Sequence, residues 1–82
     1  MNRGWVIEHL RDAHEELSRT IAEMEADSSY DVGEFIVAIQ HIYHHLNTAW
    51  NSRDETAEGV AAISDEKFYE WRRFPRDIYL GR

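Results

Sequence analysis

The stretch from Tyr30 to Arg53 constrains the fold most, because its apolar residues recur at alternating steps of three and four. That spacing places side chains on one face of an α-helix, which we interpret as a core face. Asp31 is a favourable N-cap residue with Glu34 three positions later, and Tyr30 and Phe35 are spaced as a hydrophobic staple. We therefore predict a helix that begins at about Asp31. Its apolar stripe consists of Phe35, Ala38, Ile39, Ile42, Leu46 and Ala49.

A second helical stripe lies before this stretch. Asn2 can cap a helix that runs to about Ala26, and a short polar segment, residues 26–29, follows it. So short a connection requires the two long helices to run antiparallel as a hairpin. The stripe of the first helix consists of Val6, Leu10, Ala13, Leu17, Thr20 and Met24, with Ile21 at its edge.

The last third of the chain has weaker signals. The pattern does not place the end of the second helix, which falls between Trp50 and a possible terminator at Gly59. Ser64 is a good N-cap for a short third helix. Pro75 disfavours helical backbone at the residue before it, so this helix should end near Arg73 and leave residues 75–82 as an extended C-terminal arm.

The chain is expected to form one all-α domain over residues 1–82: an antiparallel helical hairpin, a short third helix and the extended arm. Both long helices also carry apolar residues outside their main stripes, and a helix that is apolar on more than one face is covered on more than one side. A chain of 82 residues has little core of its own. We therefore expect a homodimer that forms a four-helix bundle. The residues outside the stripes are Trp5, Ile7, Ile21, Ile36, Val37, Tyr43 and Trp50.

Charge and composition exclude several classes of function. The net charge of −7 argues against nucleic-acid binding, which needs a basic face. The chain has no cysteine, no signal-peptide pattern and no apolar run long enough for a membrane span, so a cytoplasmic protein without membrane contact is expected. Residues 67–82 carry five basic and two acidic side chains, whereas residues 1–66 carry four and fourteen. This asymmetry favours docking of a basic arm on an acidic body.

Histidines and carboxylates line one flank of each long helix. On the second helix this flank holds His41 and His45, spaced i and i+4, with Glu34 in line with them. In an antiparallel hairpin, equal rise along the two helices sets Glu16 opposite His41 and Asp12 opposite His45, with His9 near the level of Thr48. The two flanks should therefore converge. The candidate metal ligands are His41, His45, Glu16, Asp12 and His9.

Two interpretations of this strip remain open. A pair of histidines one helical turn apart chelates a divalent metal such as zinc, and carboxylates from the facing helix can complete the shell. In residue type this resembles metal-binding bundle families such as the DinB-like and hemerythrin-like proteins. The Glu-x-x-His motif of ferritin-like sites and the His-Glu-x-x-His motif of zinc proteases are both absent. Alternatively, the histidines pair with Glu16 and Asp12 and pack at an interface.

No feature of the sequence specifies an enzymatic activity. The strip has no nucleophile beside it, and the chain has no glycine-rich phosphate loop. The sequence favours a small, non-enzymatic interaction or structural module that acts as a homodimer, with another protein partner also compatible. The alternative is a metal-binding helical bundle that uses the strip between the two long helices.

Overall fold

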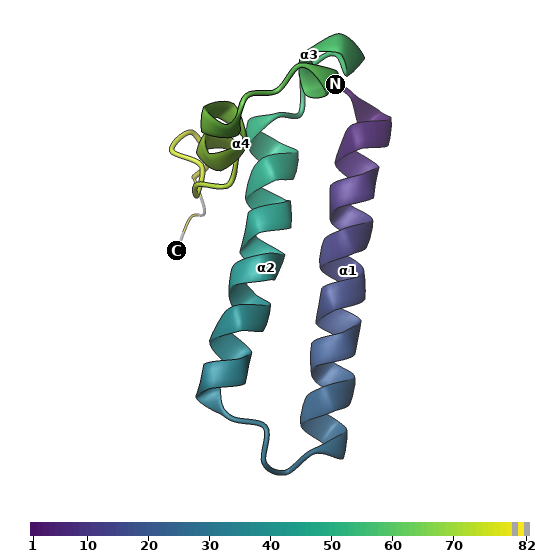
Figure 1. The fold of residues 1–82 in the computed structure, drawn as a ribbon, viewed down its shortest axis with the longest axis vertical. Helices are drawn as coiled ribbons and strands as arrows, with labels where there is room; N and C mark the ends of the chain where they lie inside the picture. Colours follow the sequence, from purple (N-terminus) through teal and green to yellow (C-terminus); the bar gives the residue numbers. More distant parts are fainter. Residues whose placement is uncertain (80, 82) are drawn as a thin grey trace.

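The computed structural model describes residues 1–79 and 81, and it consists of four helices without a strand in that part of the chain. The helices are α1 (Arg3–Ala26), α2 (Val32–Asn51), α3 (Ala57–Ala61) and α4 (Asp65–Trp71). Figure 1 shows α1 and α2 packed side by side as an antiparallel hairpin, with α4 against the C-terminal half of α2. The prediction of an all-α fold built on a helical hairpin is confirmed.

The predicted helix starts are confirmed by their capping bonds. The side-chain oxygen of Asn2 accepts from the Trp5 amide at 3.2 Å, and that of Asp31 accepts from the Glu34 amide at 3.0 Å. Ser64 caps α4 in the same way by accepting from the Lys67 amide at 3.2 Å. Each bond satisfies a backbone donor that has no partner inside its helix.

Asn2 also fastens the two ends of the hairpin together. Its backbone amide donates to the Arg53 carbonyl at 2.6 Å, and its side-chain amide donates to the Glu55 carbonyl at 3.0 Å. The start of α1 is therefore bound to the segment that follows α2. Figure 1 shows the N-terminus beside this segment, at the end of the hairpin far from the loop between the two helices.

The second helix ends inside the predicted interval between Trp50 and Gly59, but the segment after it contains a helix that was not predicted. The second helix ends at Asn51, and an additional helix, α3, follows after the turn. Gly59, a possible terminator of the second helix in the sequence, lies inside α3. The local reason is Thr56, whose side-chain oxygen accepts from the Gly59 amide at 2.9 Å and begins a new helix. A helix of five residues is too short to show a periodic pattern in the sequence.

The third predicted helix corresponds to α4, which ends at Trp71 with Arg72 as its C-cap, close to the predicted end near Arg73. The amide group of Asn51 donates to the carbonyls of Trp71 and Arg73 at 2.9 and 2.7 Å. The Asn47 amide donates to the intervening Arg72 carbonyl at 2.9 Å. Two asparagines one turn apart on α2 therefore bind three successive carbonyls at the end of α4. This long-range cap fixes both the end of the helix and its position on α2.

The core is small and lies mainly at the α4 end of the hairpin. Trp71 of α4 is only 4% exposed, and its ring lies 6.4 Å from that of Trp5 on α1. The Trp5 indole N–H in turn donates to the Ser52 hydroxyl at 2.7 Å. The hairpin interface itself is built largely from small side chains, which allow two helices to approach closely. Its buried apolar residues are Ala13, Ala38, Ile42 and Ala49.

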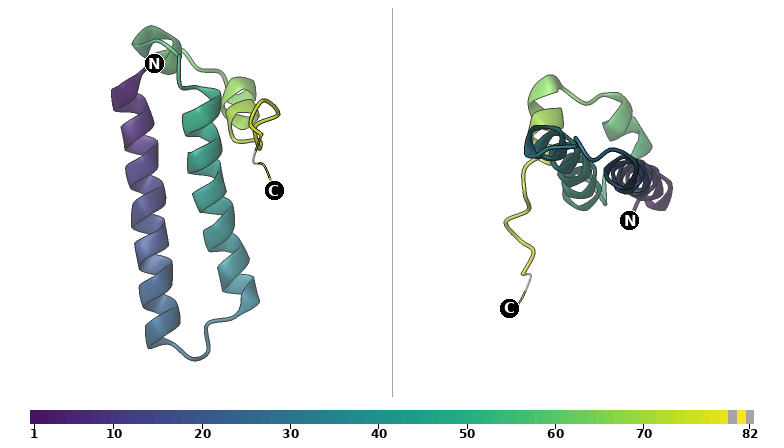
Figure 2. Two further views of the ribbon diagram at one scale, coloured as in Figure 1. Left: turned by 180° about the vertical axis from the view of Figure 1, so that it is seen from behind. Right: turned by 90° about the horizontal axis from the view of Figure 1, so that it is seen from below.

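The C-terminal arm runs along the outer side of α2. Figure 2 shows α3 and α4 on one side of the hairpin and the arm passing α2 toward the other side. The Trp50 indole N–H donates to the Asp77 carboxylate at 2.9 Å, and the Arg53 guanidinium lies 3.7 Å from the same carboxylate. The hydrogen bond from Trp50 is the main cause that lowers the pKa of Asp77. These contacts use an acid of the arm and a base of the body, the reverse of the expected charge pairing. Leu80 lies outside the described residues.

Removing the arm should destabilise the hairpin. Truncation after Phe74 removes the Asp77 contacts and the buried Pro75, so we expect a loss of about 1 to 2 kcal/mol and a melting temperature lower by several degrees. Asp77→Ala should reproduce part of this loss and shift the indole N–H resonance of Trp50. An unchanged melting temperature after truncation would show that the arm contributes nothing to stability.

Candidate functional site

Three of the five predicted ligands meet on one flank of the hairpin. His9 and Asp12 come from α1 and His45 comes from α2, and each offers one ligand atom within 4.8 Å of the other two. The Nδ1 atoms of His9 and His45 are 3.1 Å apart. The Nδ1 atom of His45 lies 3.9 Å from an Asp12 carboxylate oxygen.

The other two predicted ligands lie apart from this cluster. The carboxylate of Glu16 pairs with Arg19, one turn along the same helix, at 2.8 Å. His41 lines the same side of the hairpin as His45. The structure therefore brings together one histidine from each long helix, and His41 does not join them.

The packing around His9 orients its ring and favours its neutral form. The ring stands edge-on to Trp5, with centroids 4.4 Å apart and an angle of 81° between the planes. Burial, followed by the neighbouring His45 imidazole, lowers the pKa of His9 below its ordinary value. His9 is therefore mainly neutral at pH 7, which is the form of histidine that binds metals. In the bond between the two Nδ1 atoms, one ring donates and the other accepts.

A groove of about 240 Å³ opens beside the cluster, between the hairpin and α4. Its lining brings together four histidines from the two long helices, one threonine, one α4 side chain and the residue that caps the end of α4. The Arg72 guanidinium donates to the His44 Nδ1 atom at 2.5 Å and lies 5.1 Å from the Phe68 ring centroid. Burial, and next the Arg72 charge, lowers the pKa of His44. The lining residues are His9, His41, His44, His45, Thr48, Phe68 and Arg72.

Sequence reasoning did not anticipate the contribution of α4 to this groove. Phe68 and Arg72 are spaced i and i+4 on the predicted third helix, which places them on one side of it. That spacing was the available signal. It could not show which part of the hairpin this side would cover, because the position of α4 depends on the asparagine cap from α2.

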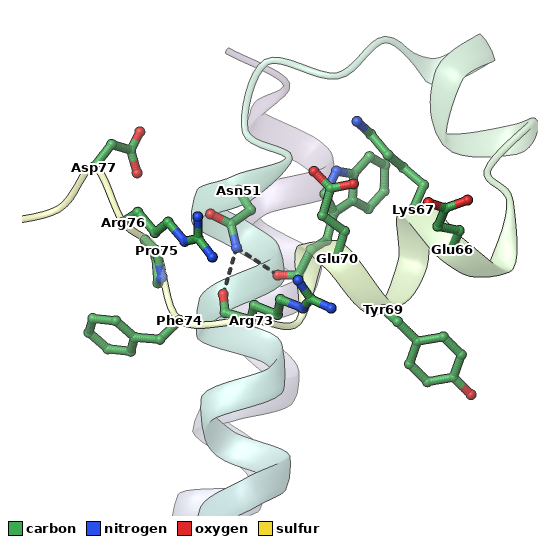
Figure 3. Close-up of a pocket in the computed structure, with 11 residues that line it drawn as sticks. Asn51, Glu66, Lys67, Tyr69, Glu70, Arg73, Phe74, Pro75, Arg76 and Asp77 are labelled. Atoms are coloured by element: carbon green, nitrogen blue, oxygen red, sulfur yellow. Dashed lines mark hydrogen bonds between the residues drawn. The ribbon is translucent and has the colours of Figure 1, made fainter.

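A second hollow of about 550 Å³ lies between α4 and the C-terminal arm (Figure 3). The side chain of Asn51 points into it and bonds the two carbonyls described above. Three bases and three acids line this hollow, so its charge does not select an ionic ligand of one sign. These are Lys67, Arg73, Arg76, Glu66, Glu70 and Asp77.

The flank opposite the histidines is apolar and exposed. On α1, Leu17 and Ile21 lie on the far side of buried Ala13 from His9, at about 100° of rotation per residue. Leu17 is 43% exposed and Ile21 is 56% exposed. The matching flank of α2 carries further large apolar side chains. We call this surface the apolar face, and its residues are Leu10, Leu17, Ile21, Met24, Phe35 and Leu46.

Comparison with known proteins does not assign a function. The sequence matches no protein-family model, and comparisons with curated proteins and with solved structures return no match. Among the described helices, none is both long enough and apolar enough to cross a lipid bilayer. The inference of function therefore rests on the two flanks of the hairpin.

Proposed function

We propose that this protein is a non-enzymatic helical interaction module that acts as a homodimer, in which two hairpins pair their apolar faces to form a four-helix bundle. The observation that carries the proposal is the apolar face itself, which extends over both long helices without cover from α3, α4 or the described part of the arm. Isolated apolar side chains on a surface are ordinary, whereas a contiguous apolar face marks an interaction site.

The exposed area of the single chain supports this proposal. A compact monomer of 9.7 kDa exposes about 5,100 Å². This chain exposes 6412 Å², and its radius of gyration is 14.7 Å where about 11.7 Å is typical of its length. The excess of roughly 1,300 Å² exceeds the roughly 800 Å² that each partner buries in a standard interface. Among the described residues, no large side chain is fully shielded from solvent.

A second copy of the chain is the partner that fits this face best. The six residues of the apolar face carry no charge, so two copies can meet there without burying like charges. A two-fold axis pairs the same patch from each chain, which requires only that the patch complement itself. Two antiparallel hairpins joined in this way give the packing of a four-helix bundle. A different protein partner is the alternative, and it would leave the purified chain monomeric.

Thiol labelling tests this arrangement directly, because the natural chain has no cysteine. A Leu17→Cys variant places a thiol on the apolar face, and an Ala22→Cys variant places one on the exposed outer side of the same helix. The dimer predicts that labelling of the Leu17 position slows as the protein concentration rises, whereas labelling of the Ala22 position does not. If the thiols at the two positions are labelled at equal rates at every protein concentration, the proposal is overturned.

A further inference from the structure

The flank that holds the histidine cluster lies opposite the apolar face, so a site there does not depend on dimerisation. We propose that His9, Asp12 and His45 form a binding site for one divalent transition-metal ion per chain, of the zinc, cobalt or nickel class. The three residues come from two helices whose relative position is fixed by the fold, and their ligand atoms already lie within 4.8 Å of one another.

The separation of the two histidines suits a shared metal. Metal–nitrogen bonds of about 2.0 to 2.1 Å in a tetrahedral shell place two ligand atoms roughly 3.3 Å apart. The Nδ1 atoms of His9 and His45 are 3.1 Å apart, so an ion between them needs only small ring adjustments. The Asp12 carboxylate is 3.9 Å from the His45 Nδ1 atom, and its side chain is largely exposed and free to turn toward the ion.

The donor set selects the class of metal. Two imidazole nitrogens and one carboxylate oxygen favour zinc, cobalt and nickel over magnesium and calcium, which prefer oxygen ligands throughout. Both imidazoles would bind as neutral rings that carry their proton on Nε2, so a metal ion replaces the hydrogen bond between the two Nδ1 atoms. The Asp12 carboxylate offsets one of the two positive charges of the ion.

Three protein ligands leave a tetrahedral ion with one open position. The groove of about 240 Å³ beside the cluster gives that position access to water. His41 lines this groove but does not belong to the cluster, so we assign it no bond to the metal. This distinguishes a site with one histidine from each helix from one that uses His41 and His45, one turn apart on α2.

The competing explanation is a structural histidine pair that packs on Trp5 and binds no ion. Titration calorimetry with Zn²⁺, and the visible absorption of added Co²⁺, distinguish the two. We expect one equivalent of metal per wild-type chain, with a loss of affinity of roughly a hundredfold or more in a His9→Ala, His45→Ala double variant. A His14→Ala variant, which removes a histidine that does not line the groove, is the control and should keep its affinity, as should His41→Ala.

An isosteric variant distinguishes the loss of a metal ligand from a loss of folding. Asp12→Asn keeps the size and polarity of an exposed side chain and removes the charge, so its helical circular dichroism should match that of wild type while its affinity for Zn²⁺ falls at least about tenfold. The proposal is overturned if wild type binds Zn²⁺ no more tightly than the His9→Ala, His45→Ala variant. It is equally overturned if His41→Ala abolishes binding while Asp12→Asn has no effect.

Discussion

Replacing Leu17 with glutamate should convert the protein into a monomer and lower its melting temperature by about 10 °C or more. Leu17 lies in the apolar face, between Leu10 and Ile21 along α1, and 43% of it is exposed in the single chain. Covering the exposed part of this side chain in a dimer contributes about 1 kcal/mol, and each kilocalorie corresponds to about 4 to 8 °C in a domain of this size. A carboxylate at this position would also have to lose its hydration without a partner.

The matched control is Ala22→Glu. It adds the same charge to the same helix on the exposed outer side, where the proposed dimer makes no contact. Its mass in solution should remain that of wild type, and its melting temperature should change by only a few degrees. If the two glutamate variants are alike in mass and melting temperature, the apolar face is not an interface.

Replacing Trp71 with alanine should cost about 3 to 5 kcal/mol of unfolding free energy. Trp71 is the large aromatic residue of the core, at 4% exposed, and it joins α4 to Trp5 of α1. The total stability of an 82-residue domain is only about 4 to 12 kcal/mol, so this variant should lose much of its cooperative unfolding transition. Denaturant unfolding followed by circular dichroism measures the loss.

Tyr69→Ala on the same helix provides the comparison. Tyr69 is 61% exposed, so its removal should cost less than about 1 kcal/mol. If the two variants lose similar amounts of unfolding free energy, burial of Trp71 does not stabilise this end of the hairpin.

The parts of the fold that depend on local chemistry were predictable from the sequence. Asn2, Asp31 and Ser64 each cap a helix within three residues of themselves, so each start follows from neighbouring residues. The position of α4 on the hairpin did not follow, because it is set by Asn47 and Asn51 of α2, which bind carbonyls at the end of α4. A cap supplied by residues twenty or more positions away leaves no local signal. The five-residue α3 is too short to leave a periodic one.

The candidate site was also predictable only in part. Equal rise along two antiparallel helices was enough to set Asp12 opposite His45, and the structure places these two side chains 3.9 Å apart. Equal rise predicts how far along the hairpin each residue lies, but it does not predict the conformation of the side chain. Glu16 was predicted to face His41, yet its carboxylate is bound to Arg19 on its own helix. The groove depends in addition on the position of α4, which only long-range contacts determine.

Pairing of the apolar face with the same face of a second chain would double the mass of the protein in solution. Sedimentation equilibrium on the full chain should be measured over the micromolar concentration range. We predict a species of twice the chain mass of 9.7 kDa, with a shift toward that mass as concentration rises. A single species of 9.7 kDa at every concentration would show that the apolar faces do not pair.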